Sequence, residues 1–353
     1  MEDANSHRLH LLSMIVGVLL VLAGAGMIVV SIFVNSLLGQ INRLEEQETL
    51  TPEEIQLILA ETDPIEVTEI AATETVPEET EETTEPPATE TVTEATEEIP
   101  EESETEPAEH TVVNILLVGQ DRRIDQPRQR SDAMILCSIN TEKMTIVLTS
   151  FLRDTYVDLP GSYGMNKLNA TYAIGGFPML NQCLLENFGV HVDYNIEVDF
   201  TGFKKVLDTL GGIDMELTAK EAEIVEGDQV VGMNHLDGGQ ALMYARIRKI
   251  DDDFERTNRQ RKVLVAVYDN VKQMSLREMF ELCNAVLPLI TTDMTNEVIT
   301  EYIFTLFPRR NDFEIITQSV PDRSEFEYDM IDGLSVVVPK LNRIRKKLAE
   351  TIG

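Results

Sequence analysis

The chain has 353 residues, enough for one large domain or two ordinary ones, and carries a formal net charge of −33. So acidic a chain lacks the broad basic surface that a polyanion requires, and we expect no nucleic-acid partner. Its three cysteines form no C-x-x-C pair and its five histidines form no H-E-x-x-H motif, which argues against a redox motif and a zinc hydrolase.

An apolar segment at residues 11–38 is the first recognisable element, and it contains no charged residue. It exceeds the roughly 20 residues that a helix needs to cross a bilayer, so it predicts one transmembrane helix after a short tail at residues 1–10. A cleaved signal peptide is the alternative, but the apolar run is too long for one. Arg8 and Arg43 flank the segment equally, so charge alone does not decide its orientation.

Residues 39–110 are predicted to form an acidic linker. Between Leu44 and His110 the chain holds 24 of its 62 Asp and Glu residues and no Lys or Arg, mixed with Thr and Pro. Such a segment cannot bury enough apolar surface to offset the entropy of ordering, which indicates a mostly disordered spacer. An interaction tail and a glycosylated threonine stalk are the alternatives, and residues 51–60 are compatible with a short helix before the tract.

After His110 the chain reads as alternating strands and helices. Strands are predicted at 111–119, 132–140, 144–152, 194–200 and 213–217, and helices at 167–188, 201–210, 219–225, 237–245, 255–274 and 276–287. Gly175 and Gly176 predict a break in the first helix. Because residues 111–353 are too few for two full cores, the pattern predicts a single three-layer α/β/α domain with a mixed central sheet.

Two carboxylates stand at the ends of the first two predicted strands of this domain. Asp121 follows the strand at 111–119, and Asp132 opens the next one. An α/β sheet places its ligands at strand ends, and two carboxylates there could share Mg²⁺, or Mn²⁺, together with phosphate oxygens. The alternative is that both residues cap turns.

Arginines gather in the stretch YARIRKIDDDFERTNRQR at 244–261. Arg246 and Arg248 alternate, so they would share one side of an extended chain. Arg256, Arg259 and Gln260 fall at helical spacing, which would place them on one helix face. Guanidinium groups match phosphate oxygens two at a time, so such a cluster in an acidic domain predicts a site for a small, dense phosphate.

Between Arg248 and Arg256, residues Asp251 to Asp253 are expected to form a solvated turn.

An adjacent Arg-Asp pair, Arg153 and Asp154, directly follows the strand at 144–152. Carboxylates suited to magnesium together with arginines describe a diphosphate site, in which metal and arginines stabilise the charge that develops as one phosphate departs. Beside a predicted membrane anchor, the simplest substrate is a diphosphate lipid.

Seven motifs in fixed order resemble the LytR-CpsA-Psr family over about residues 110–272. They are NILLVGQDRR, RSDAMILCSIN, TSFLRDTYVDLPG, NKLNATYAIGG, VDFTGFKKVLDTLGGIDM, HLDGGQALMYARIRK and DFERTNRQRKVL, and the tail DGLSVVVPKLNRIRKKLAETI resembles that family's C-terminal helix region. The fourth motif also explains Asn169-Ala170-Thr171, which imitates a glycosylation acceptor but falls in a Lys-Asn-Tyr motif at Lys167, Asn169 and Tyr172.

The resemblance implies a bacterial enzyme held in the cell membrane by a single span, with its catalytic domain at residues 111–353 outside the cytoplasm and residues 1–10 as a short cytoplasmic tail. It implies transfer of a glycopolymer, such as teichoic acid or capsular polysaccharide, from a polyprenyl diphosphate carrier to a muramic acid hydroxyl of peptidoglycan, forming a phosphodiester in a magnesium-dependent phosphotransferase reaction. A polyprenyl diphosphate hydrolase and a non-catalytic lipid-diphosphate-binding regulator of the cell envelope are the alternatives.

The resemblance also assigns roles to residues. Asp121 and Asp132 would hold the metal. The resemblance does not fix the general base, and a carboxylate near the metal, such as Asp132, is expected to take the proton of the attacking hydroxyl. The residues expected to act in catalysis are Asp132, Arg153, Asp154, Arg246 and Arg248. The residues expected to bind the diphosphate are Arg123, Arg130, Arg153, Arg246, Arg248, Arg256, Arg259 and Gln260. The lipid tail would occupy an apolar channel inside the domain.

Overall fold

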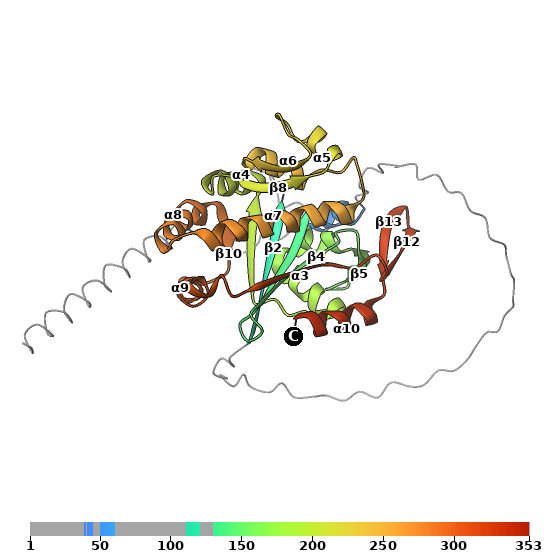
Figure 1. Cartoon of the computed structure of the whole chain (residues 1–353). Coiled ribbons are helices and arrows are strands. Elements are labelled where there is room, and N and C mark those ends of the chain that lie inside the picture. Colours follow the sequence, from blue (N-terminus) through green and yellow to red (C-terminus); the bar gives the residue numbers. More distant parts are fainter. Residues whose placement is uncertain (1–38, 40, 45–49, 61–110, 121–129, 353) are drawn as a thin grey trace, which may run out of the picture. The chain divides into compact units, whose positions relative to one another are not determined.

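Figure 1 shows the computed structural model, which describes residues 39, 41–44, 50–60, 111–120 and 130–352. The predicted transmembrane segment, most of the acidic linker, and the loop that carries Asp121 and Arg123 lie outside these residues. Within the described part of the chain, no helix has both the length and the apolar character that crossing a membrane requires.

A seven-stranded mixed sheet forms the centre of the domain, in the order β1-β10-β7-β2-β3-β4-β11. Its strands are β1 (Asn42–Arg43), β2 (Val112–Gln120), β3 (Ala133–Asn140), β4 (Thr145–Phe151), β7 (Tyr194–Asp199), β10 (Ile290–Thr292) and β11 (Glu314–Val320). Strand β2 pairs antiparallel with β3 and parallel with β7, so the mixed character predicted from the sequence is confirmed.

Helices cover both faces of the sheet (Figure 1). They are α2 (Pro52–Ala60), α3 (Leu168–Phe188), α4 (Phe200–Thr209), α5 (Ala219–Ile224), α6 (Gly238–Ala245), α7 (Asp253–Gln273), α8 (Leu276–Val286), α9 (Asn296–Thr305) and α10 (Leu341–Ile352). Leu116 and Val118 of β2 pack with α3 and α10, whereas Leu117 of the same strand faces a cavity beneath α7. This alternation of side chains produces the three layers.

Three two-stranded ribbons surround the sheet. They are β5 (Tyr156–Leu159) with β6 (Gly164–Lys167), β8 (Ile213–Leu217) with β9 (Gly232–Leu236), and β12 (Phe326–Ile331) with β13 (Leu334–Pro339). The strand predicted at 213–217 is therefore present but lies outside the central sheet. It belongs to a second buried cluster in which Ile213 and Met215 pack with Tyr244 of α6 and Val263 of α7.

Local sequence signals account for most helix boundaries. Asp199 caps α4 by accepting a hydrogen bond from the Gly202 backbone nitrogen at 2.6 Å, and Asp252 caps α7 by accepting from Glu255 at 3.1 Å. The break predicted in the helix at 167–188 is present, because Gly176 has φ 55° and ψ −147° inside α3. Only glycine adopts such a conformation at low cost, so the kink is set by the sequence.

Two segments of the predicted linker belong to the folded unit. Strand β1 lies at the edge of the central sheet, and the helix predicted at 51–60 is confirmed as α2. Ile55, Ile58 and Leu59 of α2 pack against the buried cluster beneath α3. The acidic tract at 61–110 therefore begins and ends on the same folded unit, which differs from the predicted arrangement in which all of 39–110 separates the domain from the membrane segment.

Candidate active site

Asp132 lies at the carboxyl end of β2, as the sequence predicts. Its backbone nitrogen donates to the Gly119 carbonyl oxygen at 3.1 Å, which fixes it beside the last residues of that strand. Its Oδ1 accepts one hydrogen bond from an Arg153 NH1 and one from an Arg248 NH2, each at 3.2 Å. A single carboxylate oxygen thus joins two arginines that are 95 residues apart in the chain.

Arg153 is surrounded by carboxylates. Its Nε lies 3.6 Å from Asp154 Oδ2 and 3.9 Å from Asp253 Oδ1, while its NH1 contacts Asp132. Asp154 also forms an ion pair with the buried Lys167, at 2.8 Å. Asp154 therefore contacts both Lys167 and Arg153, an arrangement that can orient the Arg153 guanidinium. The sequence marked Lys167 only as part of a motif.

Asp253 contradicts the expectation of a solvated turn. Its Oδ1 lies 2.5 Å from Arg256 NH2, and Arg256 is only 3% exposed. Burial raises the pKa of the Asp253 carboxyl, with the Arg256 and Arg153 charges opposing that rise, and burial lowers the pKa of Arg256. Asp252 forms the helix cap and a bidentate pair with Arg323, so the three aspartates have separate structural partners.

Arg246 and Arg248 reach the same cavity without an extended strand. Arg246 ends α6, with φ −104° and ψ 3°, and Arg248 lies in the loop that leads to α7. The Arg246 guanidinium stands 4.3 Å from the centre of the Phe200 ring, a geometry that attracts a cation to the ring face. The chain is not extended at this point, but both side chains line the same cavity, so the predicted convergence is observed.

The charged cluster opens into a cavity of about 430 Å³ between the sheet and helices α4, α6 and α7. The polar lining residues are Asp132, Arg246, Arg248, Arg256 and Gln260. The apolar lining residues include Leu117, Ile135, Ile196, Val198, Phe203, Leu242, Leu264 and Val267. The site therefore combines an anion-binding mouth with an apolar interior, the arrangement that an amphiphilic phosphate requires.

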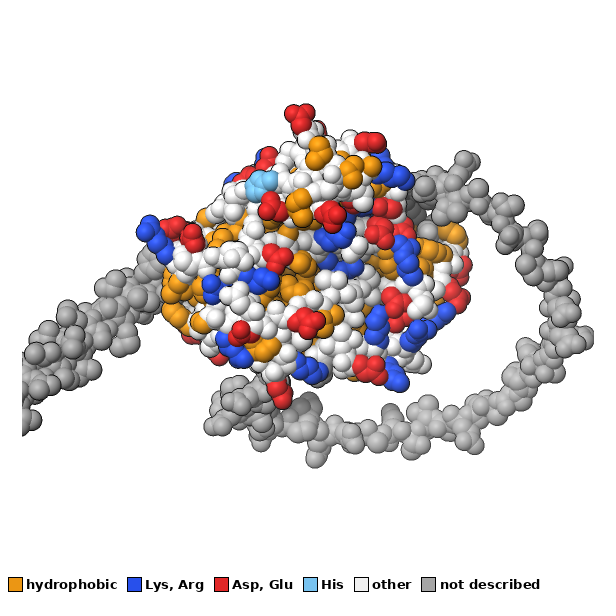
Figure 2. Space-filling model, viewed as in Figure 1, with side chains coloured by type: hydrophobic (Ala, Val, Ile, Leu, Met, Phe, Trp, Pro, Cys, Tyr) orange, Lys and Arg blue, Asp and Glu red, His pale blue; other side chains and the backbone are white. Residues whose placement is uncertain are grey.

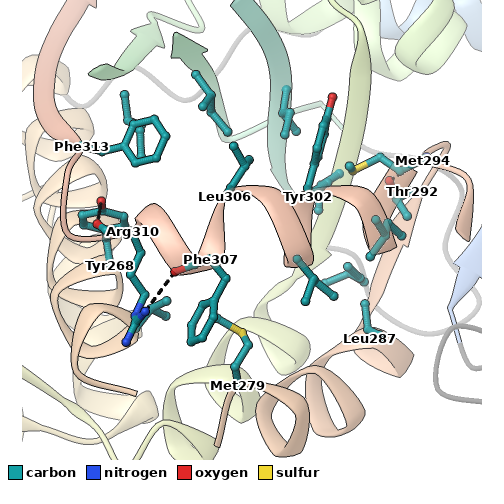
Figure 3. Close-up of a pocket in the computed structure, with 18 residues that line it drawn as sticks. Tyr268, Met279, Leu287, Thr292, Met294, Tyr302, Leu306, Phe307, Arg310 and Phe313 are labelled. Atoms are coloured by element: carbon teal, nitrogen blue, oxygen red, sulfur yellow. Dashed lines mark hydrogen bonds between the residues drawn. The ribbon is translucent and has the colours of Figure 1, made fainter. Parts of the chain in front are cut away.

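A second apolar cavity, of about 350 Å³, lies on the same face of the sheet and shares Ile196 and Ile290 with the first. Figure 3 shows its lining, with Leu306 and Phe307 pointing inward and the Arg310 guanidinium donating to the Phe307 carbonyl oxygen at 3.0 Å. Because the two cavities have lining residues in common, they lie end to end beneath α7.

Arg259, which was expected to bind the diphosphate, does not line the cavity. It is 3% exposed, and its Nε donates to Glu221 Oε1 at 2.8 Å. Its other two nitrogens donate to the Ile247 carbonyl oxygen at 3.1 Å and to the Asp251 carboxylate. The side chain therefore ties α7 to α5 and to the preceding loop.

Arg130 lies beside α2 and not in the cavity lining. Its guanidinium donates to the Ile58 carbonyl oxygen near the end of that helix, where Asn166 also donates to the Leu59 carbonyl oxygen at 3.2 Å. Asp121 and Arg123 fall outside the described residues, so their predicted roles remain predictions.

The donor set that the structure describes is compatible with a divalent cation, although Asp132 is the single predicted metal ligand within it. Its Oδ1 is held by two arginines, while its Oδ2 makes no hydrogen bond to any described residue. Hard cations such as Mg²⁺ take carboxylate and phosphate oxygens as ligands, so Oδ2 and a bound diphosphate would suit one. Among the described residues, no group of three or more His, Cys, Asp or Glu side chains converges as a metal site.

The α/β domain thus places a carboxylate, three arginines and a glutamine in the lining of an apolar cavity, a combination that suits an amphiphilic anion. Figure 2 shows that basic and acidic side chains are interspersed on the face in view. The sequence model of the LytR_cpsA_psr family matches residues 75–350 of the chain. The chain belongs to this family.

Individual relatives carry related names. The chain is 33% identical over 192 residues to the polyisoprenyl-teichoic acid--peptidoglycan teichoic acid transferase TagU of Bacillus mycoides, a match that covers 52% of this chain and 61% of that protein. It is 29% identical over 234 residues to TagU of Enterococcus faecalis, covering 65% of this chain and 75% of that protein. The first of these matches spans less than two thirds of the relative's length.

Solved structures share the fold. The crystal structure of Bacillus subtilis TagV superposes with a TM-score of 0.58 at 26% identity, covering 69% of this chain and 97% of that one. Bacillus subtilis TagT bound to LI-WTA superposes with a TM-score of 0.56 at 26% identity, covering 69% of this chain and 91% of that one. The α/β architecture with its mixed central sheet is therefore that of the family.

Proposed function

We propose that this protein transfers a glycopolymer, such as teichoic acid or capsular polysaccharide, from a polyprenyl diphosphate carrier to peptidoglycan. The observation that carries the proposal is the cavity in which Asp132 and the arginines meet an apolar interior. A polyprenyl diphosphate has the matching form, because its two phosphates are dense and anionic while its tail is hydrocarbon. The transferase names of the relatives from Bacillus and Enterococcus support the same reaction.

In the proposed reaction, a hydroxyl oxygen of peptidoglycan attacks the phosphorus that bears the glycopolymer. A phosphodiester bond forms, the bond between that phosphorus and the bridging oxygen breaks, and polyprenyl phosphate leaves. Arg246, Arg248 and Arg256 would bind the phosphate oxygens and stabilise the negative charge that grows on the departing phosphate. Gln260, from the same face of α7 as Arg256, would donate to the diphosphate.

Asp132 would change partners when the diphosphate binds. In the structure, Arg153 and Arg248 both donate to its Oδ1. Phosphate oxygens would compete for these donors and leave the carboxylate free to accept the proton of the attacking hydroxyl. Asp121 and Asp132 would together hold Mg²⁺, which when bound would neutralise phosphate charge.

The apolar segment at 11–38 would hold the protein in the bacterial cell membrane by a single span, with the catalytic domain outside the cytoplasm. Two features support this placement. A polyprenyl carrier is itself held in that membrane, and the acceptor, peptidoglycan, lies outside it.

Product analysis of the purified protein with a synthetic lipid diphosphate tests the proposal against a hydrolase. We expect glycopolymer attached to peptidoglycan oligomers when the acceptor is present, and little release of glycopolymer phosphate when it is absent. Equal release with and without acceptor would show that water is the acceptor. Tight binding with no turnover under any combination of metal and acceptor would instead favour the non-catalytic regulator.

Filling the cavity should separate lipid binding from phosphate binding. Leu264 lines the apolar interior, one helical turn beyond Gln260. We expect Leu264→Trp to weaken binding of a long-chain polyprenyl diphosphate by at least about 10-fold, because the indole occupies space that the tail needs. Binding of inorganic diphosphate, measured by calorimetry, should not change. Leu264→Met, which nearly conserves volume, is the control, and an equal loss of both ligands in the tryptophan variant would contradict the assignment.

A further inference from the structure

The chain upstream of the catalytic domain is fastened to the sheet at β1. Asn42 and Arg43 pair in parallel with Thr291 and Thr292 of β10, and Asn42 donates to the Pro288 carbonyl oxygen at 2.9 Å. Ile41, just before the strand, is 8% exposed and packs in a small cluster with Leu287. The domain therefore holds the chain firmly from Ile41 onward.

Arg43 strengthens this attachment from the other side of the strand. Its guanidinium donates to the Met294 carbonyl oxygen and to the Asn296 side-chain oxygen, at the start of α9. Backbone pairing, a buried apolar side chain and two side-chain hydrogen bonds thus act on one short segment. A freely rotating tether would show none of these contacts.

The register of the sheet shows from which end the chain arrives. Ile290 of β10 pairs with Val198 of β7, and Val198 pairs with Gly119 of β2. Since Asn42 pairs with Thr291, the preceding residue, Ile41, stands at the level of Ile290 and hence of Gly119. Gly119 is the residue that holds the Asp132 backbone, so the chain reaches β1 from the end of the sheet that carries the site.

The distance across the sheet between β1 and β2 is also small. Strands β1 and β2 are three places apart in the sheet order, which corresponds to about 14 Å at about 4.8 Å per strand. Two residues, Gly39 and Gln40, separate Ile41 from the apolar run that ends at Leu38. Three peptide steps span at most about 10 Å, so a membrane span that ends at Leu38 would leave little chain between the bilayer and this end of the sheet.

We propose that the catalytic domain docks on the membrane with the Asp132 end of its sheet facing the lipid headgroups, an inference that rests on the proposed single-span anchor. The occupant of this face is the bilayer in which the segment at 11–38 is held. Helix α4 begins at this end and exposes Thr201, Lys204 and Lys205, and lysines suit an anionic lipid surface. The diphosphate of a membrane-held carrier would then meet the arginines without leaving the interface.

The same contacts bear on the length of the acidic tract. Because residues 41–44 and 51–60 are both packed on the domain, the number of residues within 61–110 would not set the distance between the domain and the membrane. That distance depends on Gly39 and Gln40. Lengthening the chain after Gly39 and lengthening it within 61–110 should therefore have different effects on the orientation of the domain.

Lipid-borne quenchers can test the orientation in the full chain. Fluorophores are placed on Thr201→Cys, at the Asp132 end, or on Lys143→Cys, in the turn between β3 and β4 at the opposite end, with Cys137, Cys183 and Cys283 replaced by Ala. In vesicles of phosphatidylglycerol and phosphatidylethanolamine carrying spin-labelled lipid, we expect several-fold stronger quenching at position 201 than at 143. Equal quenching at the two positions would overturn the proposal.

Insertions provide the matched controls. Twelve Gly and Ser residues inserted after Gly39 should abolish the difference between the two labels, whereas the same insertion within 61–110 should preserve it. Persistence of the difference after the first insertion, or its loss after the second, would overturn the inferred role of β1. Vesicle flotation reports the anchor itself, and a chain that fails to float overturns the docking as well. Transfer from a soluble short-chain diphosphate, measured separately, reports the proposed activity independently of orientation.

Discussion

Asp132→Ala is expected to lower transfer from a synthetic lipid diphosphate to peptidoglycan oligomers by about 100- to 1,000-fold, and Arg246→Ala combined with Arg248→Ala by at least as much. Both changes remove groups from the mouth of the cavity, where charge would develop on the departing phosphate. The Asp132→Ala change also removes the carboxylate oxygen to which Arg153 and Arg248 donate hydrogen bonds. The measurement is kcat/KM at fixed Mg²⁺.

Two controls distinguish chemistry from folding. The Asp132 and Arg248 side chains are 29% and 46% exposed, so their removal should change the melting temperature little. The control is Lys346→Ala, which removes one positive charge, as Arg248→Ala does, from α10 on the opposite face of the sheet from the cavity. It should leave transfer unchanged. An unchanged kcat/KM for transfer in either cavity variant would contradict the proposed mechanism.

The parts of the fold that were predicted from the sequence are those with strong local signals. Continuous β-branched and aliphatic runs identify β2, β3 and β4, and glycines mark both the kink at Gly176 and the end of α4. Strand β12 was missed because most of its side chains are exposed and acidic residues interrupt its apolar ones. Strand β13 does contain an apolar run, with Val336 and Val337 buried, but that run was assigned to the C-terminal helix region of the family. Strand β10 was missed because three residues are too few for any periodic pattern.

The site was predicted in its composition more than in its conformation. Motif order identified Asp132, Arg153 and the α7 residues, but sequence spacing brought Arg246 and Arg248 together only for an extended chain, and the chain is not extended there. Their convergence comes from the loop between α6 and α7, whose course depends on tertiary contacts such as Arg246 over Phe200. Lys167 carried no local sign of its pairing with Asp154, because that ion pair joins the last residue of β6 to the turn between β4 and β5.

Arg259 shows why helical spacing alone is insufficient. Residues four apart, Arg256, Gln260 and Leu264, follow one face of α7 and line the cavity. Arg259 stands three residues after Arg256, which rotates it toward the side of Val263, where the second buried cluster lies. Because Arg259 is three and not four residues after Arg256, its side chain contacts Glu221 and does not reach the cavity.

Arg259→Ala is expected to lower the free energy of unfolding by about 3–5 kcal/mol, because it leaves the Glu221 carboxylate buried without its charged partner. Glu221 is 5% exposed, and the hydrogen bond from Arg259 lowers its carboxyl pKa against the opposing effect of burial. Denaturant titration measures the loss, and Arg277→Ala on the exposed face of α8, which also breaks an Arg-Glu pair, should produce no measurable change.

A double replacement separates structure from substrate binding at this position. Arg259→Met with Glu221→Leu removes both charges, so it should recover most of the stability lost in Arg259→Ala. If Arg259 is structural, the double variant transfers glycopolymer at close to the normal kcat/KM at a temperature where it is folded. A folded double variant with transfer reduced as strongly as in Asp132→Ala would instead return Arg259 to the diphosphate site, since lost packing cannot explain a stable protein that fails only in turnover.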